Sequence, residues 1–173
     1  MRISRHQMFM EIAHVVSKRS TCFRRSIGAV IIYNNNIVSI GYNGPASGEP
    51  HCTGAGCVPD GQLGCQRALH AEANAIKRAP MSDPKLWNVS NLYNCVMYTT
   101  ESPCPVCVER IIDSKISKLY YTHLYRVHNA VDLLAKHILV FRITPSGYIV
   151  DHVTGEIVDE EERQGVARTS PAA

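Results

Sequence analysis

The sequence reads HAEANAI at residues 70–76 and SPCPVC at residues 102–107, and these two segments decide the fold because their side chains must meet in space. They contain three side chains of the types that bind zinc: His70, Cys104 and Cys107. Glu72 follows the histidine by two residues, where its carboxylate can hold a proton beside a metal without binding it. Three protein ligands leave one coordination position open, which is typical of a catalytic zinc site. The segments therefore predict a catalytic zinc centre with Glu72 as its general acid and base.

The predicted chemistry is the activation of a water molecule. Zinc in such a site lowers the pKa of water in the open position to about 7, and Glu72 could take that proton and pass it to a substrate. Cys104 is the expected N-cap of a helix that begins at Pro105, where backbone N–H groups favour a thiolate. A Cys-x-x-Cys pair alone is often structural, but His-x-Glu followed by Pro-Cys-x-x-Cys is the signature of zinc nucleobase deaminases.

The composition is that of an ordinary globular protein. The chain has 173 residues, of which 45% are apolar and 19% are charged, enough for one domain with a complete core. The net charge of +3 does not by itself indicate nucleic acid, although it suits a small anionic substrate. We expect a cytoplasmic protein without a membrane partner, because no run of about 18 apolar residues occurs and the N-terminus does not resemble a secretory signal.

Apolar spacing predicts alternating strands and helices. Residues 4–19 have helical spacing with Ser4 as the N-cap, and residues 26–42 read as a hairpin of two buried, central strands. A helix is expected from His70 until just before Pro80. Further strands are expected at residues 93–99, 118–122 and 138–143, and further helices at residues 105–114 and 128–137. This order indicates one three-layer α-β-α domain of the α/β class.

Several segments together carry a resemblance to a known family. They are residues 30–32, 41–44 (Gly-Tyr-Asn-Gly), 70–76 and 102–107, followed by Ile111 and Ile112. With them the chain resembles the cytidine deaminase superfamily, and within it the deoxycytidylate (dCMP) deaminases, over residues 4–143. The resemblance implies a five-stranded mixed sheet with helices on both faces. It also implies a zinc-dependent enzyme that hydrolyses dCMP to dUMP and ammonia and so supplies dUMP for thymidylate synthesis.

The same resemblance implies regulation and assembly. Homo-oligomers, often hexamers, are expected, with dCTP as an activator together with Mg²⁺ and dTTP as an inhibitor. The effector would contact the turn formed by Tyr42, Asn43 and Gly44. The zinc-dependent deaminase domain is expected at residues 1–143. Residues 144–173 are expected to form an extension with a hairpin around Thr154 and Gly155 and a frayed tail.

Substrate-binding residues follow from the resemblance as well: Asn43, Ala71, Arg24, Arg25, Ser26 and Tyr125. The matching asparagine of the family holds the deoxyribose hydroxyl, although an Asn-Gly pair is also a strong turn signal. The two arginines lie where the family places its phosphate-contacting segment, and arginine binds phosphate bidentately. They could equally form a solvated corner, and the sequence does not say which one points inward. An aromatic side chain near the nucleotide would be Tyr125, for which core packing is the competing account.

Four further cysteines suggest a second, structural zinc: Cys22, Cys52, Cys57 and Cys65. Some deoxycytidylate deaminases hold such an ion, and Cys22 and Cys52 match the two positions that the resemblance implies. The other two ligands vary in the family, and His51 could replace one cysteine. A closed site would order the long loop over residues 43–69, because metal binding can supply folding free energy. Free thiols are the alternative. Cys95 lies in a predicted strand and is expected to be a core thiol.

Three other functions are compatible with the zinc motif. A tRNA adenosine deaminase shares it but needs a basic surface for RNA, so we expect no nucleic-acid partner here. A free cytidine or cytosine deaminase is disfavoured slightly by the arginine pair. A zinc-stabilised nucleotide sensor without catalytic activity would need no carboxylate at position 72, so Glu72 argues against that class.

Overall fold

The computed structural model describes residues 2–52, 57–58, 65–82 and 92–158. Within these ranges the helices are α1 (Arg5–Ser17), α2 (Ala71–Ser82), α3 (Pro105–Asp113) and α4 (Asn129–Leu134). The strands are β1 (Gly28–Tyr33), β2 (Asn36–Tyr42), β3 (Val96–Glu101), β4 (Lys118–His123), β5 (Leu139–Ile143) and β6 (Ile149–Asp151). Residues 159–173, most of the expected extension, lie outside the described residues.

The strands form one mixed sheet with the order β2-β1-β3-β4-β5-β6. Strands β3, β4 and β5 run parallel, whereas β1 runs antiparallel to both of its neighbours and β6 runs antiparallel to β5. The expectation of five strands is therefore too low by one. The sixth strand exists because Ile149 and Asp151 continue the sheet, pairing with Ile143 and Phe141 of β5.

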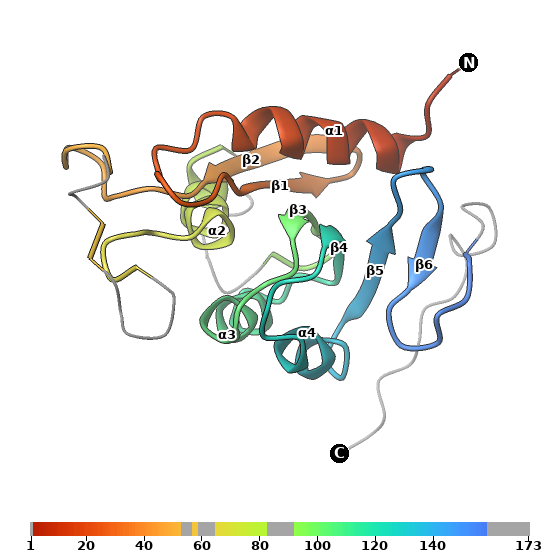
Figure 1. The fold of residues 1–173 in the computed structure, drawn as a ribbon. Coiled ribbons are helices and arrows are strands. Elements are labelled where there is room, and N and C mark those ends of the chain that lie inside the picture. The colour runs from red at the N-terminus through yellow and green to blue at the C-terminus, as the bar shows by residue number, and fades with distance from the viewer. Residues whose placement is uncertain (1, 53–56, 59–64, 83–91, 159–173) are drawn as a thin grey trace.

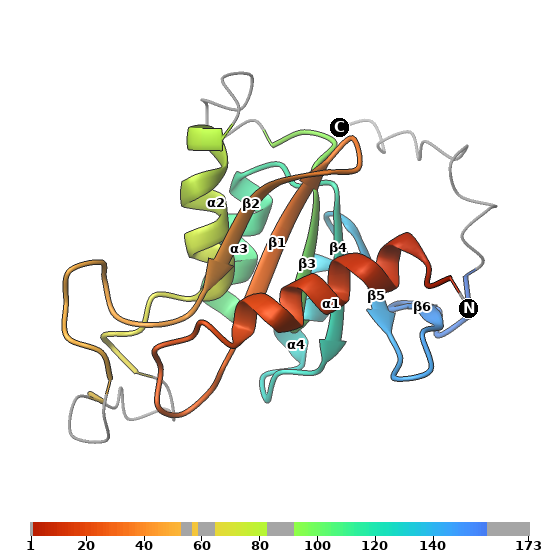
Figure 2. The same ribbon diagram turned by 90° about the horizontal axis from the view of Figure 1, so that it is seen from above.

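Helices cover both faces of the sheet, so the expected three layers are confirmed. Helix α1 lies on one face, and α2, α3 and α4 lie on the other (Figures 1 and 2). Strand β1 is buried on both sides because its residues alternate between two cores. Ala29 and Ile31 pack with the three-helix layer, whereas Val30 and Ile32 pack with α1.

The N-terminal helix and the first hairpin form as their sequences predict. Ser4 caps α1, and its side chain accepts a hydrogen bond from the backbone N–H of Gln7 at 3.1 Å. The Gln7 side chain in turn accepts from the backbone N–H of Ser4 at 3.0 Å, which completes a capping box. Asn34 and Asn35 connect β1 to β2 with positive φ angles of 47° and 62°. Asparagine tolerates this conformation, which a two-residue hairpin turn requires.

Two expectations about these elements are wrong in detail. Strand β2 lies at the edge of the sheet and not in its centre, and Ile37 and Ile40 on it are exposed. An apolar, β-branched strand alone does not distinguish an edge position from a central one. Helix α2 continues past Pro80 to Ser82 instead of ending before the proline. A proline in the final turn removes one helical hydrogen bond but does not by itself end the helix.

The arrangement of strands places a candidate binding site at the carboxyl ends of the parallel strands β3 and β4. Strands β3 and β4 end there at Glu101 and His123, and the helices α2 and α3 begin beside them. The backbone N–H of Ser102 donates to the carbonyl of His123 at 2.7 Å, which holds the two strand ends together. Ligands of α/β sheets bind outside the carboxyl ends of parallel strands. Among the described residues, no helix has the length and apolar character needed to cross a membrane.

Candidate metal centre and substrate cavity

The segments 70–76 and 102–107 meet in space as expected. Nδ1 of His70 lies 3.2 Å from Sγ of Cys104 and 3.2 Å from Sγ of Cys107. All three ligand atoms lie within 4.8 Å of one another. Zinc bonds of ordinary length in tetrahedral geometry would place nitrogen and sulfur about 3.6 Å apart. The donor set and its spacing therefore fit zinc with only a small adjustment.

Helix starts place these side chains. His70 directly precedes α2, Cys104 is the N-cap of α3, and Cys107 lies in the first turn of α3. Pro105 occupies the first helical position, where its missing N–H costs nothing. The positive ends of two helix dipoles thus point at the same place, which favours thiolates and other anions there. This local structure is the one that the motif predicts.

The Gly-Tyr-Asn-Gly turn fixes the height of His70 above the sheet. Gly44 and Leu69 form an isolated bridge, with hydrogen bonds of 3.1 Å and 2.8 Å between their backbones. A Cβ atom at Gly41 would collide with the carbonyl oxygen of Ala71 at the start of α2. Glycine at this position therefore lets α2 approach β2 closely, and the bridge then leads the chain into the ligand histidine.

Electrostatics within the triad already favour one thiolate. The hydrogen bond with Cys107 is the largest of the effects that together lower the pKa of Cys104 to about 4. The same hydrogen bond, together with burial, raises the pKa of Cys107. The hydrogen bond with Cys104 raises the pKa of His70, while burial opposes that shift. The Cys104 sulfur is thus held as an anion beside Cys107 and His70, and a bound divalent cation would displace the protons that these two partners still carry.

Glu72 lies beside this triad and is not part of it. It is the second residue of α2, is only 5% exposed, and lines the same cavity as His70 and Cys104. Burial raises the pKa of its carboxyl group above the ordinary value. A carboxylate that is costly to ionise and sits next to a metal centre is suited to accept and return protons.

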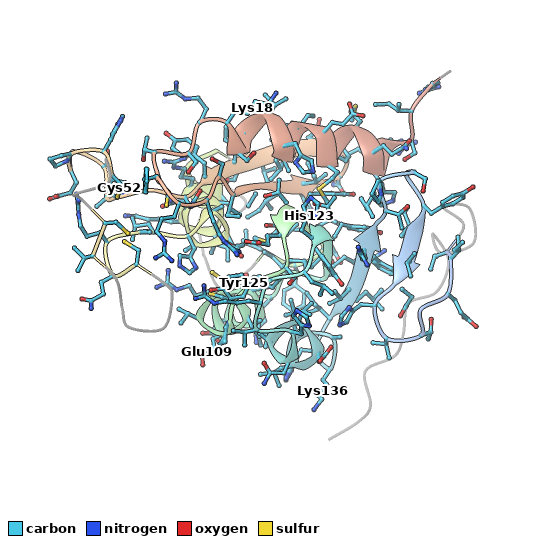
Figure 3. The ribbon with its side chains drawn as sticks, viewed as in Figure 1. Lys18, Cys52, Glu109, His123, Tyr125 and Lys136 are labelled. Atoms are coloured by element: carbon cyan, nitrogen blue, oxygen red, sulfur yellow. The ribbon has the colours of Figure 1, made fainter. Side chains whose placement is uncertain are left out.

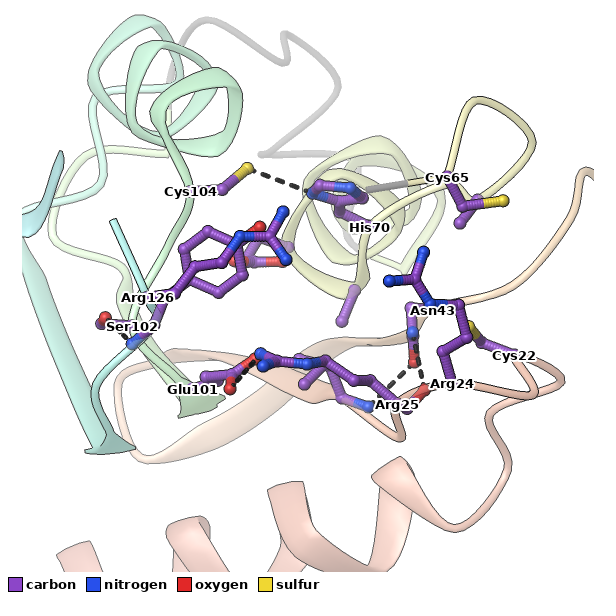
Figure 4. Close-up of a pocket in the computed structure, with 15 residues that line it drawn as sticks. Cys22, Arg24, Arg25, Asn43, Cys65, His70, Glu101, Ser102, Cys104 and Arg126 are labelled. Atoms are coloured by element: carbon purple, nitrogen blue, oxygen red, sulfur yellow. Dashed lines mark hydrogen bonds and ion pairs between the residues drawn. The ribbon is translucent and has the colours of Figure 1, made fainter. Parts of the chain in front are cut away.

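A cavity of about 350 Å³ extends from the triad across the ends of β3 and β4. Its size lies within the range of small-molecule sites. Three guanidinium groups line it, those of Arg24, Arg25 and Arg126 (Figure 4). A cavity lined by both a candidate metal centre and cations is complementary to a small molecule that carries an anionic group.

Tyr125 connects the arginines. The guanidinium carbon of Arg25 lies 5.5 Å from the centroid of its ring, and that of Arg126 lies 5.0 Å from it. Arg25 also forms an ion pair of 2.6 Å with Glu101, the last residue of β3. Burial raises the pKa of the Tyr125 hydroxyl, so the ring faces the cavity as a neutral phenol. Figure 3 shows Tyr125 in front of the strand ends.

Asn43 is a buried side chain with several partners. Its Oδ1 accepts hydrogen bonds from the Ser20 hydroxyl at 2.7 Å and from the Ile27 N–H at 2.8 Å. Its Nδ2 donates to the Arg25 carbonyl at 2.9 Å. Asn43 therefore ties the Gly-Tyr-Asn-Gly turn to the segment that carries the arginines, and it lines the cavity as well.

The structure brings most of the expected substrate residues together, though not all of them. Asn43, Ala71, Arg24, Arg25 and Tyr125 line the cavity. In contrast, Ser26 is exposed and is not among the lining residues. Of the proposed effector turn, Tyr42 and Gly44 do not line the cavity either. Tyr42 instead packs under Arg78, whose guanidinium carbon lies 5.4 Å from the ring centroid.

Sequence reasoning missed three polar lining residues, Glu101, Ser102 and Arg126, and two apolar ones, Ile27 and Ala68. Arg126 directly follows Tyr125, so the choice of the tyrosine could have included its neighbour. Glu101 and Ser102 precede the Pro-Cys motif at the end of a predicted strand. Polar side chains at the carboxyl end of a parallel strand are the signal that would have found them.

The four cysteines of the predicted second zinc site, Cys22, Cys52, Cys57 and Cys65, do not form a tight cluster. In residues 2–52, 57–58, 65–82 and 92–158, the one group of three or more metal-ligand side chains with converging ligand atoms is the triad described above. Even so, burial raises the pKa of Cys52, and the charges of Cys65, Cys22 and Cys57 add to that effect. Cys57 also hydrogen-bonds to Cys65. The four thiols therefore lie near one another, with Cys22 on the loop between α1 and β1 and the other three on the loop between β2 and α2, where Figure 3 shows Cys52.

The His70–Cys104–Cys107 triad offers three protein ligands, which would leave one coordination position of a zinc ion open, and the buried Glu72 lies next to it. This composition is typical of catalytic metal centres. Comparison with known proteins narrows that class. Residues 3–123 match the family model of the cytidine and deoxycytidylate deaminase zinc-binding region. This match covers well over half of the chain, and the chain therefore belongs to that deaminase family.

Named relatives and solved structures agree with the family. The ComE operon protein 2 of Bacillus subtilis is 35% identical over 127 residues, and the deoxycytidylate deaminase of Schizosaccharomyces pombe is 31% identical over 126 residues. These matches cover 73% and 69% of this chain but only 64% and 37% of the two relatives. The structure of dCMP deaminase from the cyanophage S-TIM5, in complex with dCMP and dUMP, superposes with a TM-score of 0.69 and 28% identity. That match covers 82% of this chain and 98% of the phage chain.

Proposed function

We propose that this chain catalyses the hydrolytic deamination of dCMP to dUMP and ammonia with a zinc-activated water. Several deoxycytidylate deaminases among its relatives support this substrate. The similarity to a phage enzyme whose structure contains dCMP and dUMP supports it as well. The observation that carries the proposal is a single cavity that joins the His70–Cys104–Cys107 triad and Glu72 to three arginines.

Glu72 is the group that moves protons. When bound by the triad, zinc supplies the Lewis acidity that makes water a nucleophile near neutral pH. The water oxygen forms a bond to C4 of the cytosine ring, and Glu72 carries one water proton to N3. Glu72 then carries the second proton to the exocyclic nitrogen, the C4–N bond breaks, and ammonia leaves a uracil ring behind. Burial of Glu72 excludes bulk water from these transfers.

The deoxyribose hydroxyl would meet Asn43, and Ala71 would face the base. Oδ1 of Asn43 already accepts two hydrogen bonds, and one Nδ2 hydrogen is committed to the Arg25 carbonyl. An amide nitrogen has two hydrogens, so Asn43 can contribute its second one to the sugar. Ala71 begins α2 between His70 and Glu72 and lines the cavity, so its methyl group would lie against the base.

The phosphate would lie against the arginines. Arginine pairs bidentately with phosphate, and such charge-assisted bonds are the strong ones in proteins. Arg24, Arg25 and Arg126 approach the cavity from two segments, the loop before β1 and the loop after β4. The guanidinium groups of Arg25 and Arg126 both lie against the ring of Tyr125. A free nucleoside has no anionic group to bind at this cationic wall, which is the reason to prefer the monophosphate.

Further properties follow from the family resemblance alone. These are a second, structural zinc on Cys22, Cys52, Cys57 and Cys65, activation by dCTP with Mg²⁺, inhibition by dTTP, and a homo-oligomer with six subunits. Effector binding would use Tyr42, Asn43 and Gly44. Residues 1–143 would be the deaminase domain and residues 144–173 an extension of it. The dUMP produced would enter thymidylate synthesis.

A substrate panel tests the proposal. Purified protein is incubated separately with dCMP, dCTP, cytidine and tRNA, and ammonia release is measured. We expect release from dCMP at a kcat/KM at least tenfold above that for the other three. The Glu72→Gln variant controls for contaminating deaminases. Preferential ammonia release from cytidine or tRNA would contradict dCMP as the substrate. No ammonia release from any of the four compounds by zinc-loaded protein would contradict the proposal that the chain is an enzyme.

A further inference from the structure

A histidine in the extension joins two distant parts of the chain. Nδ1 of His152 lies 2.9 Å from the hydroxyl of Tyr121 on β4, and its Nε2 lies 2.8 Å from Oδ1 of Asp132 on α4. Tyr121 is 1% exposed, and the side chain of His152 is 13% exposed. His152 follows β6 directly, beyond the residues 3–123 that match the family model. The contact is therefore a feature of the extension.

We call the hydrogen-bonded chain Tyr121–His152–Asp132 the relay. The chemistry of these three groups fixes the direction of each hydrogen bond in it. A carboxylate can only accept hydrogen bonds, so Nε2 of His152 carries the hydrogen that Asp132 accepts. In the neutral ring Nδ1 is then an acceptor, and the Tyr121 hydroxyl donates to it. Burial raises the pKa of Tyr121, which keeps this hydroxyl protonated as the relay requires. Each polar atom in the relay is matched to a partner of the right kind.

The backbone around His152 is held firmly. Its N–H donates to the carbonyl of Val140 on β5 at 3.0 Å. The preceding Asp151 is buried, and its carboxylate accepts from the N–H groups of Val153 at 2.9 Å and Thr154 at 3.1 Å. Val150 pairs with Ile157, which closes the hairpin around Thr154 and Gly155. His152 is thus presented by a built turn and not by a free tail.

The relay holds both ends of one segment, residues 122–131, which we call the cavity arm. Tyr121 precedes this arm and Asp132 follows it, and the same imidazole binds both. A third anchor lies in the middle, where the N–H of Tyr125 donates to the Ser102 hydroxyl at 2.8 Å. The cavity arm carries Tyr125 and Arg126, which line the substrate cavity.

From these contacts we infer that His152 is a positioning residue for the nucleotide. By binding the residues at both ends of the cavity arm, it holds Tyr125 and Arg126 in position to contact the sugar-phosphate end of the substrate. This inference rests on the proposed function, because it takes dCMP as the occupant of the cavity. It assigns a role to residues 144–158 that the catalytic triad and Glu72 do not need, since none of those groups touches the relay. Loss of the relay should therefore weaken binding and leave the proton transfers intact.

Steady-state kinetics of His152→Ala with dCMP separate these effects. We expect KM to rise about tenfold, since small misplacements of substrate-binding groups cost that much or more. The inhibition constant of the product dUMP should rise by the same factor, while kcat and zinc content stay at the parental values. Val153→Ala, at the adjacent residue that is 72% exposed, is the matched control and should change none of these quantities.

Conservative variants distinguish the relay from a general loss of stability. Tyr121→Phe and Asp132→Ala each remove one contact and should raise KM about threefold, whereas Asp132→Asn keeps an acceptor oxygen and should stay near the parental KM. An unchanged KM in His152→Ala would overturn the inference while leaving the proposed function intact. A fall in kcat and zinc content with KM unchanged would also overturn it, as a purely structural effect. If the parental protein itself does not deaminate dCMP, it is the proposed function that fails.

Discussion

Nη1 of Arg25 donates to Oε1 of Glu101 at 2.6 Å, although 76 residues separate them in the sequence. The ion pair joins the loop before β1 to the end of β3 and closes one wall of the cavity. It also shows that one of the two adjacent arginines has a carboxylate partner within the cavity itself. A nucleotide phosphate would therefore bind among guanidinium groups that are already oriented by Glu101 and Tyr125.

Loss of an arginine should weaken nucleotide binding more than catalysis. We expect Arg126→Ala to raise the KM for dCMP by roughly tenfold to a hundredfold, the usual cost of one charged hydrogen-bond partner, with kcat changed less than threefold. Lys136→Ala removes an exposed cation on the far side of α4 and serves as the control. The readout is ammonia release across a range of dCMP concentrations. An equal rise in KM in Arg126→Ala and Lys136→Ala would mean that only the overall charge of the protein affects dCMP binding.

Replacement of the buried carboxylate should separate metal binding from catalysis. Glu72→Gln keeps the size of the side chain, and Glu72 is not among the converging metal ligands. We expect full zinc occupancy and a loss of kcat of about 10²–10⁴, the range for a positioned general acid and base. Glu109→Gln, on the exposed side of α3, should behave as the parent does. Loss of zinc from Glu72→Gln would show that the carboxylate also holds the ion.

The pH dependence of kcat/KM should report the environment of Glu72. Burial raises the pKa of this carboxyl group, and it must be ionised to accept a proton from water. Activity should therefore fall on the acid side at a pH above the ordinary glutamate value of about 4.3, because the protonated form becomes populated earlier as pH decreases. A profile of kcat/KM from pH 4 to 9, in buffers of constant ionic strength, measures this limb. An acid limb centred at the ordinary value would contradict the assignment of Glu72 as the base.

Removal of the metal should abolish activity reversibly. Dialysis against a chelator should eliminate ammonia release and lower Tm, because a ligand that binds only the native state stabilises it, and more so the tighter it binds. Addition of Zn²⁺ should restore both, whereas Mg²⁺ should not, since two thiolates and an imidazole bind zinc in preference to a hard cation. Retained ammonia release in protein shown to be metal-free would contradict the zinc-dependent mechanism.

Metal counting tests the second zinc. Elemental analysis of the parental protein should give two zinc ions per chain, and Cys57→Ser or Cys65→Ser should reduce the count to one. Both variants should also bind substrate less tightly, because Cys65 lines the cavity next to Ala68. Cys95→Ala, which alters a buried core thiol, is the control and should keep both ions. One zinc per parental chain would exclude the second site.

Local sequence patterns were sufficient to predict which residues converge at the candidate metal centre and to predict the order of most helices and strands. The cap at Ser4, the start of α3 at Pro105 and the asparagine turn between β1 and β2 all follow from short-range hydrogen bonding and backbone preference. The sixth strand was missed because its three residues are too short for periodicity to be read. The edge position of β2 was missed because pairing between strands is not a property of either strand alone.

The sequence by itself predicted that His70, Cys104 and Cys107 would converge as a candidate metal centre with Glu72 beside it, and the three ligand atoms do converge. It could do so because each ligand lies at a helix start, and the geometry of a helix start is encoded by its own few residues. Only the tertiary structure decided that Arg25 faces Glu101, that Arg126 belongs to the cavity, and that His152 holds Tyr121 and Asp132. These contacts join residues that are 20 to 76 positions apart. They depend on which strands pair and where the loops between them end, and that is settled when the whole sheet packs against its helices.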